Sequence, residues 1–244
     1  MFLYLLVVLA ACATLLGGWL VVRYLRGRAS WLRHLSGFAA GYLLALSLVR
    51  VLPESLERSG PSMLYWVLGG FLLVHILEHG LSPHFHYGEE THHHGHPEVA
   101  VLALVGLSLH SFMDGMALSA AAQAHVNLET LMFLGILLHR IPEGATISSI
   151  FLVRGFHARG ATLAAGALAL AALIGAATQD LFHIPVGPVL AIAAGLGIYV
   201  ACADLLPEAQ KEGTWKNSIG LAAGMGLFVL SSLLFPHAHE HFHP

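Results

Sequence analysis

Charged residues are scarce along this chain. Only 10% of its 244 residues are Asp, Glu, Lys or Arg, whereas 57% are hydrophobic. Soluble globular domains carry roughly 25% charged residues. So few charges cannot cover the surface of a water-soluble protein of this length. The composition therefore predicts an integral membrane protein.

Cysteines are rare as well, and neither sign of charge is in large excess. Cys12 and Cys202 each lie within an apolar run, which argues against a framework of structural disulfides. The formal net charge of −3 favours neither nucleic acids nor acidic partners. We expect the lipid bilayer as a partner, and no nucleic acid.

Basic residues are missing from the start of the first apolar segment. A signal peptide would place them ahead of its apolar stretch. Here Met1–Val22 carries no charge, and the arginines follow it. The segment is long enough to cross roughly 30 Å of hydrocarbon. We predict a retained membrane helix, with cleavage as the alternative.

Similar apolar segments recur along the whole chain. Inside hydrocarbon every backbone polar group has to be satisfied within its own segment, so these segments are expected to be helices. We predict an all-α membrane protein with eight transmembrane helices, at about residues 2–22, 34–52, 63–79, 98–123, 128–153, 159–180, 187–207 and 217–235.

The basic residues predict the orientation, because loops rich in Lys and Arg stay in the cytoplasm. Of the eleven, eight fall in loops on one side, one lies in a loop on the other side, and two lie within spans. Both termini are then extracytoplasmic. The eight are Arg23, Arg26, Arg28, Arg33, Arg154, Arg159, Lys211 and Lys216; the others are Arg58, and Arg50 with Arg140.

An internal repeat joins the second and seventh predicted helices. Ala-Ala-Gly at 39–41 and Leu-Pro-Glu at 52–54 return at 193–195 and 206–208, at a constant offset of 154 residues. The two helices run in opposite directions, so the repeat is inverted, which is typical of transporters. It places helices 1–3 and 6–8 as two halves around a central pair. Chance matching of small residues is the alternative.

The central pair of predicted helices contains the candidate metal ligands. Residues 110–115 read His-Ser-Phe-Met-Asp-Gly, and residues 139–144 read His-Arg-Ile-Pro-Glu-Gly. Each segment places an imidazole and a carboxylate four residues apart, on one face of its helix. Two such faces offer His110, Asp114, His139 and Glu143 to one ion, a donor set that suits Zn²⁺, Fe²⁺, Mn²⁺ or Co²⁺.

The position of these carboxylates favours function over accident. A carboxylate at mid-bilayer costs about 2.5–3.5 kcal/mol on the insertion scale. This chain places one in each of two adjacent spans, each beside a histidine. A hydrogen-bonded network with a purely structural role is the alternative reading.

These segments resemble the fourth and fifth helices of Zrt/Irt-like (ZIP) divalent-metal transporters, whose patterns are H-N-x-x-D/E-G and H-x-x-P-E-G. The Leu-Pro-Glu sequences and the histidine-rich stretch after the third helix are also similar to that family. The resemblance covers essentially the whole chain. It implies a 3+2+3 helix arrangement, import of zinc or a similar ion into the cytoplasm, and a transport site at His110, Asp114, His139 and Glu143.

The chain departs from the family at two positions. Members that bind two ions usually have Asn where Ser111 stands, and a carboxylate or amide where Arg140 stands. Ser111 is a poor ligand, and the guanidinium of Arg140 keeps its charge. We therefore predict one bound ion, with Arg140 paired to Asp114 or Glu143 in place of a second. Three consequences of this departure stay open: a changed transport rate, a changed metal selectivity, or loss of transport.

Further candidate residues lie away from the central pair. For Asp204, solvation at a helix end is the favoured interpretation, and a place on the exit path is the alternative. Short histidine-rich tracts bind metals without a fold. We expect residues 80–97 to be a cytoplasmic loop and residues 236–244 an extracytoplasmic tail that capture ions, with a plain polar linker or terminus as the alternative. Their histidines are His84, His86, His92, His93, His94, His96, His237, His239, His241 and His243.

We interpret residues 1–244 as a single transmembrane transporter domain in the cell membrane. It is expected to import zinc by alternating access, and the same donors also accept Fe²⁺, Mn²⁺, Co²⁺ or Cd²⁺. We expect no enzymatic activity. A membrane metal sensor and an intramembrane metal-dependent hydrolase are the rival hypotheses, and a homodimer stays open.

Overall fold

The computed structural model describes residues 2–24, 30–81, 97–210 and 216–235, and these residues form helices without strands. Most elements are α-helices, and two are short π-helices. In chain order they are α1 (Phe2–Arg23), α2 (Ser30–Leu46), η1 (Ser47–Val51), α3 (Leu52–Ser59), α4 (Met63–Leu81), α5 (Pro97–Ala124), α6 (Val126–Val153), α7 (Ala158–Phe182), α8 (Val186–Tyr199), η2 (Val200–Leu205), α9 (Leu206–Gln210) and α10 (Lys216–Leu234).

The lengths of these helices fit a membrane protein. Within the described residues, six helical stretches are long and apolar enough to cross a bilayer, and two more are apolar but shorter. The six are Phe2–Arg23, His34–Ser59, Glu98–Ala124, Val126–Val153, Ala158–Phe182 and Val186–Leu205; the two are Met63–Leu77 and Ser218–Leu234. The prediction of an all-helical membrane protein is confirmed.

The two π-helices occupy equivalent places in the predicted repeat. Each ends one residue before the Leu-Pro pair, at Pro53 and Pro207. Proline has no N–H, and its ring clashes with the carbonyl four residues earlier, so the backbone widens there. The N–H of Leu52 donates to the carbonyl of Ser47, and that of Leu206 to the carbonyl of Ala201. Because Pro53 stands in the first turn of α3, where it is tolerated, the helix continues past the predicted end at residue 52 to Ser59.

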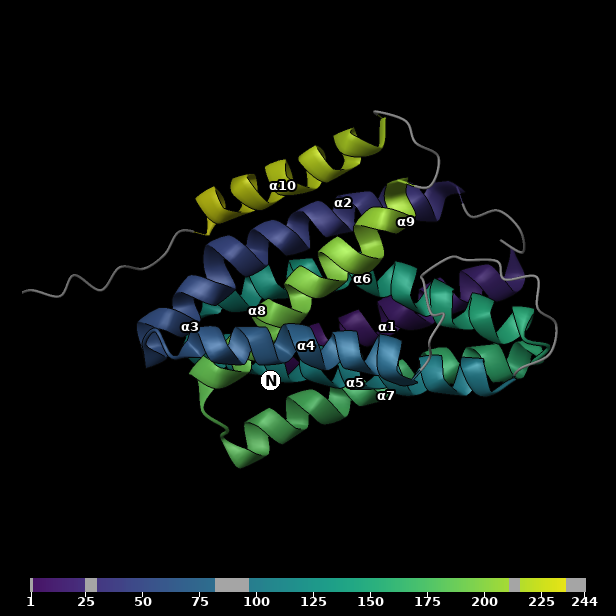
Figure 1. The fold of residues 1–244 in the computed structure, drawn as a ribbon, viewed down its shortest axis with the longest axis horizontal. Coiled ribbons are helices and arrows are strands. Elements are labelled where there is room, and N and C mark those ends of the chain that lie inside the picture. The colour runs from purple at the N-terminus through teal and green to yellow at the C-terminus, as the bar shows by residue number, and fades with distance from the viewer. Residues whose placement is uncertain (1, 25–29, 82–96, 211–215, 236–244) are drawn as a thin grey trace, which may run out of the picture.

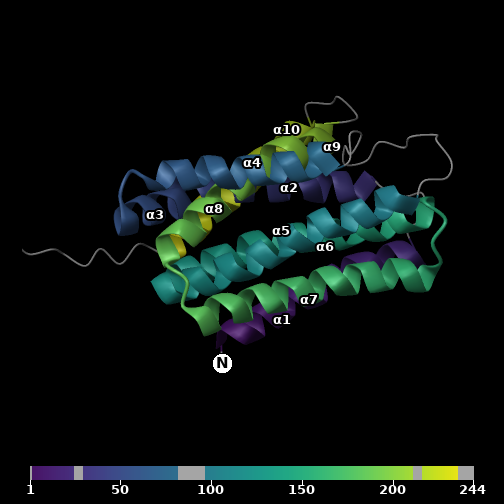
Figure 2. The same cartoon turned by 60° about the horizontal axis from the view of Figure 1, so that its bottom comes forward.

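The helices form two groups (Figures 1 and 2). One group contains α1, α5, α6 and α7, and the other contains α2, α3, α4, α8 and α10. The central pair α5 and α6 thus packs with the first helix of each sequence half rather than standing apart between two blocks of three. The groups meet where α2 contacts α6 and where α8 contacts α5.

Glycine contacts show why the helices pair in this way. A Cβ added to Gly41 of α2 would clash with the carbonyl of Leu221 in α10, and one added to Gly195 of α8 would clash with that of Val67 in α4. Gly195 lies 154 residues after Gly41, and Val67 lies 154 residues before Leu221, so each residue of the second contact is equivalent to one of the first. The two groups of contacts are therefore copies of one arrangement, as the repeat predicts.

A second set of contacts relates α5 to α6. Gly144 of α6 lies against the backbone of Thr14 in α1, and Gly115 of α5 against that of Ala172 in α7. The two glycines, in α5 and α6, are 29 residues apart in the sequence, and their contact residues, in α1 and α7, are 158 residues apart. The same 29-residue shift carries His110 onto His139 and Asp114 onto Glu143. The candidate metal ligands thus occupy equivalent positions in the two related helices.

The basic helix ends gather at one end of the bundle. The turn between α6 and α7 lies at that end, whereas the turn between α3 and α4 lies at the other, with the N-terminus (Figure 2). Arg23 ends α1, and Arg154 and Arg159 flank the α6–α7 turn; Arg58 lies in the last turn of α3. This distribution matches the one used to predict the orientation.

Both histidine-rich segments lie largely or wholly outside the described residues. The ten histidines predicted to capture ions fall within residues 82–96 and 236–244. Their role stays a prediction.

The matched glycine contacts predict a stability difference. Gly195→Leu should lower the free energy of unfolding by about 1–3 kcal/mol, because the new side chain meets the backbone of α4. Gly69→Leu is the control, since a Cβ there meets nothing within 4 Å. Thermal unfolding of both variants in detergent measures the effect. Equal melting temperatures would contradict the proposed role of the contact.

Candidate metal centre

The candidate residues lie halfway along two neighbouring helices. His110, Ser111 and Asp114 belong to α5, and Arg140 and Glu143 belong to α6 together with His139. The i, i+4 spacing turns each imidazole and its carboxylate toward the same side of the helix. Since α5 and α6 are in contact, these two sides face each other.

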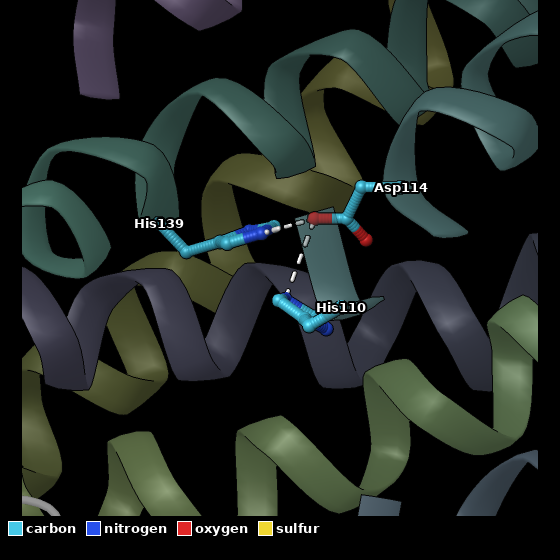
Figure 3. Close-up of side chains that lie close together, drawn as sticks. All are labelled: His110, Asp114 and His139. Atoms are coloured by element: carbon cyan, nitrogen blue, oxygen red, sulfur yellow. Dashed lines mark hydrogen bonds and ion pairs between the residues drawn. The ribbon is translucent and has the colours of Figure 1, made fainter. Parts of the chain in front are cut away.

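Three of the four predicted ligands come together. The Nε2 atoms of His139 and His110 lie 2.9 Å and 3.4 Å from Oδ2 of Asp114. One ligand atom from each residue lies within 4.8 Å of the others. Both imidazole rings turn toward the Asp114 carboxylate (Figure 3). The geometry suits one cation shared by two nitrogens and an oxygen.

A backbone hydrogen bond sets the tautomer of His139. Its Nδ1 lies 2.9 Å from the carbonyl oxygen of Gly135, so this nitrogen donates its proton there. In the neutral ring, Nε2 then presents a lone pair to Asp114. A lone pair and a carboxylate oxygen at such a distance repel each other unless a proton or a cation lies between them. Metal-binding histidines typically have such an orienting partner on the other nitrogen.

Glu143 is outside this group of three. Its Oε2 accepts a hydrogen bond from Nη1 of Arg140 at 2.6 Å, and its Oε1 accepts one from Oγ of Ser111 at 2.8 Å. The structure thus brings Glu143 to Arg140 and Ser111, and not into the group formed by His110, Asp114 and His139.

Arg140 bridges the two carboxylates. Besides Glu143, it reaches Oδ2 of Asp114 with Nη2 at 3.1 Å, and its side chain is only 1% exposed. A planar guanidinium has several donors in a fixed geometry, so one side chain can serve two acids. With neutral imidazoles, two carboxylates and one guanidinium leave a net charge of −1 at the site. The guanidinium of Arg140 lies beside the group of His110, Asp114 and His139 and brings a positive charge there.

A cavity of about 50 Å³ opens beside the site. His110, His139 and Glu143 line it together with Asp204 of η2, and apolar residues of α4, α5, α8 and η2 form the rest of its wall. The wall residues from α4 lie in its last half, and those from α5 lie in its first half except Met113, so the cavity extends toward the end where α4 ends and α5 begins. Asp204 is buried at 7% exposure, so solvation at a helix end does not describe its position.

Two features of the site did not follow from the residue patterns. Met113 lines the cavity beside His110, and nothing in its spacing distinguishes it from other apolar residues. The carbonyl of Gly135 orients His139. Helix geometry contains a signal for this contact, since the two residues are four positions apart in one helix.

Comparisons with known proteins show what this chain is similar to. The family model described as "ZIP Zinc transporter" matches residues 84–232, a range that contains both α5 and α6. The chain is 28% identical over 225 residues to the zinc transporter ZupT of Escherichia coli O7:K1, covering 84% of this chain and 86% of the relative. It is 32% identical over 134 residues to ZupT of Salmonella paratyphi A, covering 50% and 51%.

The bridging geometry predicts that Arg140 stabilises the fold. Arg140→Leu leaves two buried carboxylates without their cation and should cost about 3–5 kcal/mol. The control is Arg159→Leu, because Arg159 is exposed in the first turn of α7, and surface substitutions change stability by about 0.5 kcal/mol or less. Thermal unfolding without added metal compares the two. An equal decrease in melting temperature in both variants would contradict the stabilising role of Arg140.

Proposed function

Because the chain belongs to the ZIP zinc transporter family, we propose that it carries a divalent transition-metal ion, zinc foremost, across the cell membrane into the cytoplasm. The ion is the substrate, and it is held by His110, Asp114 and His139. The observation that carries the proposal is the convergence of these three ligands, from two neighbouring helices, beside a cavity. The family consists of transporters, which leaves the hydrolase hypothesis without support.

The number of protein ligands suits passage rather than storage. Structural zinc sites use four protein ligands, whereas sites with three keep a position for water or another exchangeable group. Two imidazoles and one carboxylate bind zinc well, and Fe²⁺, Mn²⁺, Co²⁺ or Cd²⁺ also fit this donor set. An ion held in this way can exchange its last ligand with the cavity.

Glu143 is proposed as a fourth ligand that can take the place of the exchangeable group at the ion. It lines the same cavity as His110 and His139, and it carries the charge equivalent to Asp114 in the related helix. Its oxygens are bound by Arg140 and Ser111 in this structure. A shift of Arg140 toward Asp114 alone would release one oxygen for the ion.

The orientation of the chain in the membrane is inferred from charge. Helix ends with Arg23, Arg154 and Arg159 mark the cytoplasmic side by the positive-inside rule. The cavity extends from the site toward this same side and includes Asp204, which we propose as part of the exit path. The histidine-rich residues 82–96 join α4 to α5 at that side and are proposed to accept the released ion.

Removal of a ligand should abolish transport. We expect His110→Ala, Asp114→Asn and His139→Ala each to reduce zinc uptake into proteoliposomes on the order of tenfold or more, since loss even of a residue that orients a ligand costs 10–100-fold. His157→Ala is the control, because His157 is exposed at the start of α7.

Two outcomes of this assay would count against the proposal. Zinc that binds the unmodified protein without flux would favour a membrane metal sensor. Uptake that survives all three substitutions would move the site elsewhere.

The positive charge at position 140 predicts one ion per chain. Arg140→Glu should raise the number of bound zinc ions from one to two, because it replaces a buried cation with a ligand next to Glu143. Arg140→Gln is the control, since it removes the charge and adds no carboxylate. Metal analysis of the purified variants after dialysis gives the stoichiometry. An unchanged single ion in Arg140→Glu would refute this account of Arg140.

A further inference from the structure

One of two equivalent glycines in the related helices α5 and α6 is covered. A Cβ added to Gly135 of α6 would lie 2.6 Å from Cδ2 of Leu46 and 3.4 Å from Cε1 of Tyr42. Both of these side chains are completely buried, and they belong to the main apolar cluster of the bundle. At this end of the site, the packed side chains leave no space beside Gly135.

The equivalent glycine is open. Gly106 of α5 is 29 residues before Gly135, and a Cβ added there would meet nothing within 4 Å. It lines the cavity, together with Leu196 and Val200. These two residues lie 154 positions after Tyr42 and Leu46, at the offset of the repeat. The side chains that would cover Gly106 by symmetry are present but withdrawn from it.

The correspondence extends beyond the glycines. We call the side chains packed around Gly135 the closed cluster. Within it, the hydroxyl of Tyr42 donates to the carbonyl of Leu131 at 3.4 Å, and the Tyr42 ring packs edge to face against Phe228, with 5.7 Å between the ring centroids. The residues equivalent to Leu131 and Phe228 are Leu102 and Val74, and both line the cavity. The closed cluster and the cavity are therefore built from equivalent positions, packed on one side of the site and apart on the other.

We propose that Gly106 is a seat that receives Leu196 and Val200 in a second arrangement of the helices, as Gly135 receives Tyr42 and Leu46 in the present one. In that arrangement the cavity closes on its present side and the cluster around Gly135 opens. The inference rests on the proposed transport function, and it adds a specific role for a residue that binds no ion.

The first test places a side chain at position 106. Gly106→Leu places a side chain in open space in the present arrangement, so the protein should fold and bind zinc as before. Zinc uptake should fall on the order of tenfold, because the second arrangement can no longer close. Gly69→Leu is the matched control, since it also adds a side chain in open space, on a helix that borders the cavity, and should transport normally. Equal uptake by the two variants would overturn the proposal.

The second test needs no transport. In a Cys12→Ala, Cys202→Ala background, cysteines are introduced as the pairs Gly106→Cys with Val200→Cys and Gly135→Cys with Leu46→Cys. A short bifunctional thiol reagent should link both pairs, the second in the present arrangement and the first whenever the cavity closes.

The outcomes separate the seat from the transport function. Linkage of the second pair alone, with or without zinc, would overturn the seat even if uptake is intact. Linkage of both pairs in a protein without zinc flux would support the seat and refute the transport function.

Discussion

The site depends on the cost of placing charge inside hydrocarbon. Asp114, Arg140 and Glu143 each carry a full charge in helices that cross the bilayer, and an unpaired charge there is expensive. The Arg140 guanidinium removes most of this cost by binding both carboxylates. The guanidinium and the two imidazoles all approach the same oxygen, Oδ2, of Asp114.

The rest of the bundle holds this pair in place by close backbone contact. Gly144 and Gly115 allow α1 and α7 to approach α6 and α5, so that the site helices belong to one group of four. Lipid offers no hydrophobic driving force between helices, so small residues at their contacts matter more than in water. The second group, built on α2 and α8, repeats its contacts at the offset of 154 residues. Around this symmetrical frame the apolar side chains are packed on one side of the site and separated on the other, which is what a carrier in one of its two arrangements requires.

The sequence was sufficient for the helices, the family and the facing of the two motifs. Absence of charge marks the spans, and i, i+4 spacing fixes which side chains share a face. It was insufficient where several partners were within reach. Glu143 can reach an ion, Ser111 or Arg140, and only the packing of α5 on α6 selects the last two. The end of the second span was misplaced because Pro53 reads as a helix stop, although it is tolerated in the first turn of α3. The cavity depends on which arrangement the helices adopt, and a residue pattern common to both arrangements does not encode it.

Anomalous X-ray scattering from zinc-soaked crystals tests the central assertion most directly. The account predicts one zinc peak per chain at about 2.0–2.2 Å from the Nε2 atoms of His110 and His139 and from an Asp114 oxygen. It also predicts that the Arg140 guanidinium, and no second metal ion, lies between Asp114 and Glu143. A peak on the far side of Arg140, or two peaks between α5 and α6, would contradict it.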